Sequence, residues 1–258
     1  MRLLCVALLF TTLPALAAER FTGTWKLDVA SAKFSQKPAI FEIGNGTFKC
    51  VSCDPPVTVK ADGEDQAVSG HASYDTESVR IIDDRSIEQI EKKAGKTVHK
   101  AKFTVSSDGA AATEEFTTWP ASSDKPVTGG VTLKRVGKST AGMHAFSGSW
   151  LADKAQNISE NALLATFEQT ADGLKMTQPT GEHYDAKLDG KTYPYGGSAD
   201  VQQVVLKRIG PRAIEETDKR GEKVVSTAEM TVSPNGKSMT MVVHESTGGV
   251  STFTFVKQ

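Results

Sequence analysis

The segment KCVSCDPP contains the residues whose type and spacing most directly suggest chemistry. Cys50 and Cys53 are separated by two residues. In an oxidising compartment such a pair forms a disulfide, and a bridge that is easily reduced can exchange with other thiols. A reactive dithiol of the thioredoxin type lies at a helix N-terminus, whereas this pair lies between apparent strands and before Pro55 and Pro56. We therefore expect a structural disulfide, with redox activity or metal binding as alternatives.

Histidine spacing gives no metal signature, because the five histidines are scattered and form neither an H-x-H nor an HExxH pattern. The glycines match no phosphate-binding loop, and no G-x-S-x-G nucleophile motif occurs. We accordingly expect no metal and no cofactor, and no pattern supports an enzyme.

The sequence that contains these residues is an internal repeat. FTGTWKLD (21–28) returns as FSGSWLAD (146–153), and 83–109 aligns without a gap on 210–236, so that residue n corresponds to residue n + 127. Arg85, Ile87, Glu88 and Val105 are among the residues that recur. The chain is therefore predicted to be an internal duplication, with units at 18–140 and 145–258 joined by the Gly- and Ser-rich stretch 137–145.

Each unit is predicted to be all-β, since its segments are short, rich in Val and Thr, and separated by Gly, Asn, Asp or Pro. Asp108-Gly109 and Asn235-Gly236 favour two-residue type I′ turns. The resulting register places apolar residues opposite one another, as the pairs Met230–Met241 and Ala228–Val243 illustrate. Eight to ten strands per unit suit a small up-and-down antiparallel β-barrel, with a β-sandwich as the alternative.

The same register predicts which side chains face inward. His99 and Glu114 share the inward face of the first unit with Ala101, Phe103 and Phe116. A His and a Glu inside a barrel could orient a polar ligand or act as an acid–base pair, or they could lie solvated at its mouth. Their counterparts in the second unit are Ser226 and Met241, so this pair is not shared.

Tyr193 and Tyr195 lie in the turn DGKTYPYGG. Two aromatic rings there could cap a ligand at a barrel mouth, or they could equally fill a small core.

Gly23-Thr24-Trp25 and Gly148-Ser149-Trp150 each open an expected first strand. They resemble the G-x-W signature of lipocalins and related calycin barrels. With AKLDGKTYP (186–194), the pattern is similar to a lipocalin-like domain of secreted bacterial proteins. The resemblance implies tandem barrels in which Trp25 and Trp150 close the barrel floor. It also implies a basic partner for each ring from a last strand, and Arg135 and Lys257 fit that role.

Composition narrows the classes of function. The 258 residues carry 30 basic and 31 acidic side chains, interspersed along the chain, which gives no basic face for nucleic acid. Residues 1–17 combine Arg2, an apolar run and Ala15-Leu16-Ala17, as a cleaved signal peptide does. We expect a periplasmic or secreted protein whose mature chain has no membrane span.

These observations favour non-catalytic binding of a small, largely apolar ligand inside one or both barrels. The alternatives are an envelope protein–protein interaction or inhibitor module with solid barrels, and a redox role for Cys50 and Cys53. The candidate ligand-binding residues are the inward hairpin positions and the turn tyrosines: Ala101, Phe103, Phe116, His99, Glu114, Met230, Met241, Val243, Tyr193 and Tyr195.

Overall fold

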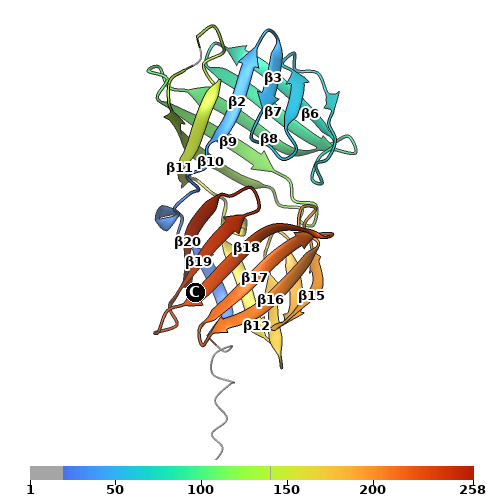
Figure 1. Ribbon diagram of the computed structural model, residues 1–258, viewed down its shortest axis with the longest axis vertical. Coiled ribbons are helices and arrows are strands. Elements are labelled where there is room, and N and C mark those ends of the chain that lie inside the picture. The colour runs from blue at the N-terminus through green and yellow to red at the C-terminus, as the bar shows by residue number, and fades with distance from the viewer. Residues whose placement is uncertain (1–19, 140) are drawn as a thin grey trace, which may run out of the picture.

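The computed structural model describes residues 20–139 and 141–258, and the expected signal segment 1–17 lies outside them (Figure 1). The described chain is all-β and forms two ten-stranded antiparallel sheets, in agreement with the predicted fold class. Its two helical segments are short 3-10 turns, η2 (Val29–Ser31) and η3 (Glu160–Ala162). Among these residues no helix has the length and apolarity that a bilayer crossing requires.

The first sheet, which we call the N-terminal barrel, uses consecutive strands. They are β2 (Ala39–Gly44), β3 (Thr47–Cys50), β4 (Val57–Lys60), β5 (Gln66–Ala67), β6 (Thr76–Asp83), β7 (Ser86–Lys93), β8 (Lys96–Val105), β9 (Ala111–Thr118), β10 (Val127–Val136) and β11 (Gly148–Gln156). The sheet is nearly closed: β4 and β5 are its two edges, and an isolated bridge joins Asp62 to Arg80.

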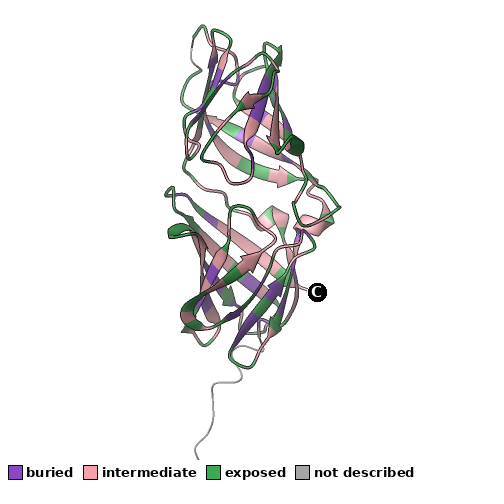
Figure 2. Ribbon diagram, turned by 90° about the vertical axis from the view of Figure 1, so that its right-hand side faces the viewer, coloured by how far each residue is buried: buried purple, intermediate pink, exposed green. Residues whose placement is uncertain are grey.

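The second sheet, the C-terminal barrel, is closed. Its strands are β1 (Gly23–Leu27), β12 (Leu164–Gln169), β13 (Gly173–Thr177), β14 (His183–Lys187), β15 (Asp189–Gly196), β16 (Gln203–Gly210), β17 (Ala213–Arg220), β18 (Lys223–Val232), β19 (Ser238–Glu245) and β20 (Val250–Lys257). Buried and exposed residues alternate along these strands, as a sheet with one interior face requires (Figure 2). The β-sandwich alternative is therefore wrong for a sheet that closes on itself.

The two copies exchange their first strands. β1 pairs with β12 and β20 of the C-terminal barrel, whereas β11, which carries the second G-x-W motif, pairs with β10 and β2 of the N-terminal barrel. In Figure 1 the blue β1 accordingly lies in the same barrel as the red β20. The N-terminal barrel thus spans 39–156, and the C-terminal barrel combines β1 with 164–257.

This exchange modifies the expected division at 18–140 and 145–258. The chain crosses between the barrels at 28–38 and 157–163, which follow β1 and β11. The stretch 137–145, expected to be the joint between units, instead lies in the connection between β10 and β11 of one sheet.

The two G-x-W motifs make the same contacts, each in one of the barrels. Trp25 and Trp150 are buried, and each indole Nε1 donates to the carbonyl of the Phe four residues earlier, at 2.7 and 2.8 Å. The Arg135 guanidinium lies 4.0 Å from the centre of the Trp150 ring, and Lys257 Nζ lies 5.3 Å from that of Trp25. The expected basic partners are therefore present.

The motif glycine makes room for the basic side chain. Gly23 and Gly148 both have φ of +129°, and a Cβ at either would lie 2.6 Å from an atom of Lys257 or Arg135. A larger residue would displace the cation from its tryptophan, so this contact requires glycine at the motif position.

The hairpin register is confirmed in both copies, since Met230 pairs with Met241 and Phe103 with Glu114. The turn type is wrong. Among the described residues, neither Asp108 nor Asn235 has positive φ, while Gly109 and Gly236 do, at 72° and 71°. A type I′ turn needs positive φ at both central residues, so the same register is reached through a longer turn closed by the glycine.

Candidate functional site

The interior of the C-terminal barrel holds a cavity of about 230 Å³. Its lining comes from both copies, because Leu27 of the exchanged strand β1 contributes alongside the strands of the second copy. The apolar part of the wall is formed by Leu27, Ala162, Leu163, Leu164, Ala165, Phe167, Met176, Ala228, Met239, Met241, Val243 and Phe255.

The polar part of the wall gathers on β17 and β18. Glu216 and Asp218 follow the buried Ile214 at two-residue spacing, so all three side chains point into the barrel. Ser226 is the cross-strand partner of Asp218. Gln178 and Tyr195 complete the polar lining.

Hydrogen bonds fix the two carboxyls in place. The Tyr184 hydroxyl donates to Glu216 Oε2 at 2.7 Å, and the Ser226 hydroxyl donates to Asp218 Oδ2 at 2.8 Å. Asp218 Oδ1 is buried and has no hydrogen-bond partner among the described residues. Each carboxyl is therefore held by one hydroxyl donor, while one oxygen of Asp218 stays without a partner.

Burial governs the electrostatics of this pair. It raises the pKa of Glu216, and the Asp218 carboxyl raises it further. Burial also raises the pKa of Asp218, against the lowering effect of the Ser226 hydrogen bond. Among the described residues that line the cavity, none is basic. The barrel therefore encloses an acidic pair without a cation of its own.

The N-terminal barrel carries polar side chains at the same inward positions. Gln89, Glu91 and His99 correspond to Glu216, Asp218 and Ser226, and they occupy the same places in the strand pairing. Two further carboxyls, Glu77 and Glu114, replace Val204 and Met241. Burial raises the pKa of Glu77, Glu91 and Glu114 to about 7 each.

Two larger side chains stand in the N-terminal barrel at positions that line the cavity in the C-terminal barrel. His99 and Phe116 stack with their ring centres 6.1 Å apart. The corresponding residues of the C-terminal barrel are Ser226 and Val243, which both line the cavity. At these two positions the side chains of the N-terminal barrel are larger than those of the C-terminal barrel.

The structure places the predicted site residues in different environments. Met241, Val243 and Tyr195 line the cavity, whereas Met230 is buried in the core beside it. Tyr193 packs on the same core and donates to Asp189 at 3.0 Å, away from the cavity lining.

In the N-terminal barrel, Ala101 and Phe103 are core residues, and Phe116 packs against them. His99 Nδ1 bonds the Thr118 hydroxyl at 2.8 Å, and burial lowers the pKa of the ring. Among the described residues, the side-chain hydrogen bond of His99 goes to Thr118 and none joins it to Glu114.

Sequence reasoning missed the acidic pair and Leu27. The alternation Ile214, Glu216, Asp218 was a usable signal, because a strand whose first inward residue is Ile214 must turn the two carboxyls inward as well. Leu27 could not be found this way, since its contribution depends on the strand exchange.

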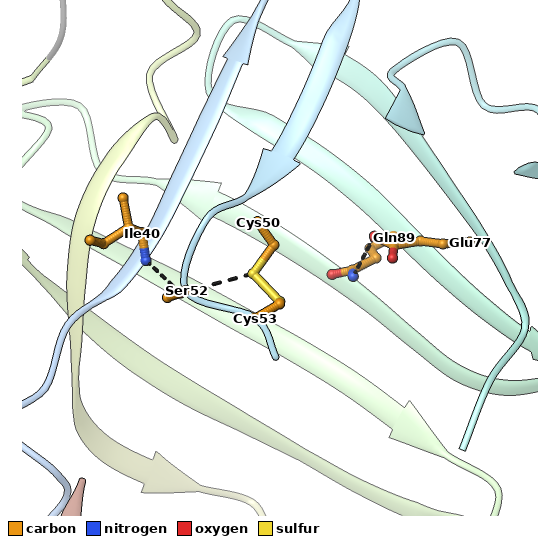
Figure 3. The surroundings of a disulfide bond; sticks show 6 residues. All are labelled: Ile40, Cys50, Ser52, Cys53, Glu77 and Gln89. Carbon is orange, nitrogen blue, oxygen red and sulfur yellow. Dashed lines mark hydrogen bonds between the residues drawn. A yellow bond between two sulfur atoms is a disulfide. The ribbon is translucent and has the colours of Figure 1, made fainter. Parts of the chain in front are cut away.

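The expected disulfide joins Cys50 to Cys53, with an S–S distance of 2.04 Å (Figure 3). Cys50 is buried at the end of β3, and Ser52 accepts a hydrogen bond from the backbone N–H of Ile40 at 2.9 Å. Figure 3 also shows Gln89, whose amide donates to Glu77 at 2.9 Å, near the bridge. Among the described residues, no cluster of three or more His, Cys, Asp or Glu is arranged to hold a metal ion.

The fold and cavity define a protein of two β-barrels, of which the C-terminal barrel contains the cavity described above. In comparisons with known proteins, neither a family model nor a curated sequence matches this chain.

Proposed function

We propose that this protein binds, without catalysis, a small and largely apolar ligand inside its C-terminal barrel. The observation that carries the proposal is the cavity of about 230 Å³, which is lined by twelve apolar residues and five polar ones. Binding sites for small molecules commonly have this composition. The lipocalin-like character of the G-x-W motifs agrees with the proposal, since small barrels of this kind hold ligands in their interiors.

We further propose a periplasmic or secreted location. The signal-like segment 1–17 supports it, and so does the Cys50–Cys53 disulfide, because disulfides persist in oxidising compartments. The N-terminal barrel then serves as a filled structural partner to the hollow one.

Native mass spectrometry of the protein purified from its own host tests the binding function. The expected result is an excess mass that is lost on denaturation and identifies the ligand. The matched variant is Ser226→His with Val243→Phe, which gives the hollow barrel the side chains that fill its twin. This variant should fold and lose the excess mass. A ligand-free wild-type protein, or an excess mass that the filled variant retains, would remove the support for this site.

A further inference from the structure

We propose that the ligand of the C-terminal barrel carries a cationic nitrogen, an ammonium group, that lies against the carboxyls of Glu216 and Asp218. The inference rests on the function proposed above and names the chemical class of its ligand.

The two carboxyls concentrate acceptors at one part of the wall, and Gln178 and Tyr195 are the other polar groups of the lining beside Ser226. Tyr184 and Ser226 each donate to one carboxyl oxygen, which holds both carboxyls in fixed orientations. Asp218 Oδ1 remains without a donor from the protein's N–H and hydroxyl groups. An ammonium group carries three donors and no acceptor, so it complements this end of the cavity.

The charges in the cavity wall also favour a cationic ligand. A buried carboxylate is normally paired with a cation, because removing it from water without a partner is costly. Here the other polar groups of the wall, Ser226, Gln178 and Tyr195, are uncharged, and the described lining contains no Lys, Arg or His. Burial is the largest cause of the raised pKa of both Glu216 and Asp218, and no basic side chain in the described lining offsets it. A ligand ammonium would supply it, whereas a ligand carboxylate would add a like charge.

The N-terminal barrel provides an internal comparison. Opposite Glu91 it has His99, a nitrogen base on the protein itself, and Gln89 donates to Glu77. Opposite Asp218 the C-terminal barrel has only Ser226, and the space beyond belongs to the cavity. The N-terminal barrel thus places His99 and Gln89 beside its carboxyls. At the position equivalent to His99, the C-terminal barrel has the small Ser226, which lines the cavity.

The cavity volume limits the apolar part of the ligand. Sites for drug-sized ligands run from about 300 to 1,000 Å³, so about 230 Å³ suits a short chain or one ring. The proposed ligand is therefore a small amine with its apolar part against Met239, Met241 and Phe255.

Calorimetric titration of the mature protein with three probes of matched size tests the inference. The probes are hexylamine, 1-hexanol and hexanoic acid, at pH 7 and one ionic strength. We expect hexylamine to bind at least about tenfold more tightly than 1-hexanol, the step that one charge-assisted hydrogen bond provides, and hexanoate to bind most weakly. Glu216→Gln and Asp218→Asn should each reduce the preference for the amine while 1-hexanol still binds. Glu91→Gln, at the position equivalent to Asp218 in the other barrel, should leave all three affinities unchanged.

The possible failures are distinguishable. If 1-hexanol or hexanoate binds wild-type protein as tightly as hexylamine, recognition of a cation is wrong and the binding function stands. If none of the three binds folded protein, both proposals fail. The comparison of probes on wild-type protein decides the question even if a variant does not fold.

Discussion

Trp25 packs beneath Lys257, although the two residues lie near opposite ends of the chain. Trp150 packs in the same way against Arg135 in the other barrel. Each tryptophan is therefore buried in a barrel built mainly from the other copy of the repeat. The exchange ties the two barrels together and brings Leu27 into the cavity wall.

The exchange predicts which barrel each tryptophan stabilises. Trp25→Ala should loosen the C-terminal barrel and Trp150→Ala the N-terminal barrel, each at a cost of about 3–5 kcal/mol, the usual loss for a buried Trp. Hydrogen exchange measures this directly: Trp25→Ala should accelerate exchange in β12 and β20, and Trp150→Ala in β2 and β10. Acceleration in β2 and β10 on loss of Trp25 would contradict the exchange.

The crossing segments predict how the chain can be divided. Fragment 39–156 contains all ten strands of the N-terminal barrel and should fold alone. Fragment 164–258 lacks β1, which leaves β12 and β20 as open edges and exposes apolar residues that β1 covers. Adding a synthetic peptide of residues 20–33 should restore its cooperative unfolding, measured by circular dichroism. A scrambled peptide is the control, and a fragment that unfolds cooperatively without any peptide would count against the prediction.

Glu114 predicts a pH-dependent stability of the N-terminal barrel. Burial raises its pKa from the ordinary 4.5 to about 7, so the folded state holds the proton more tightly than the unfolded state. Its contribution to stability is fully present below pH 4.5 and is lost as the pH rises through 7. At a scale of about 1.4 kcal/mol per pKa unit, the loss is roughly 3–4 kcal/mol.

Glu114→Gln tests this contribution, because the amide keeps the shape and cannot ionise. The variant should be more stable than wild type at pH 8 and about equally stable at pH 4.5, as measured by urea unfolding. His99, whose pKa burial lowers, stays in both proteins, so its opposing effect cancels in the comparison. An equal stability difference at the two pH values would refute the assignment.

The Cys50–Cys53 bridge should be structural. Because it closes a very short loop, its removal in a Cys50→Ser, Cys53→Ser double variant should cost at most about 2 kcal/mol in unfolding free energy. The protein should still fold, as the C-terminal barrel closes without a disulfide. Ligand binding should be unchanged, since the bridge lies in the other barrel. Loss of binding in this folded variant would instead support the redox alternative.

The sequence predicted the register of neighbouring strands within a copy. It did not predict that the first strand of each copy pairs with the strands of the other copy. Alternating apolar residues defined how β18 faces β19, because a slip of one residue would turn Met230 outward. The motifs around Trp25 and Trp150 are so similar that either could close either barrel. Which barrel each one closes depends on the short crossings at 28–38 and 157–163, where no residue pattern marks a preference.

The hairpin register predicted the apolar half of the site, and the alternation along β17 was a signal for its acidic half that went unused. Met241 and Val243 followed from the hairpin register, whereas Glu216 and Asp218 stand in the charged stretch EETDKR, which is typical of a solvent-facing strand. Whether the barrel is hollow depended on the volumes of Ser226 and Val243 relative to His99 and Phe116. This difference in side-chain volume can be related to a cavity only when the structure shows that these residues face the barrel interiors.

The central claim is that the C-terminal barrel takes up small apolar molecules in its cavity. NMR of the methionine methyl groups tests this claim most directly. Met176, Met239 and Met241 line the cavity, and Met143 lies against Gly44 in the N-terminal barrel and serves as the internal control. On titration with hexylamine or 1-hexanol, the three cavity methyl signals should shift together and saturate while the Met143 signal stays in place. Cavity signals that remain fixed, or that shift no more than Met143, would contradict the account.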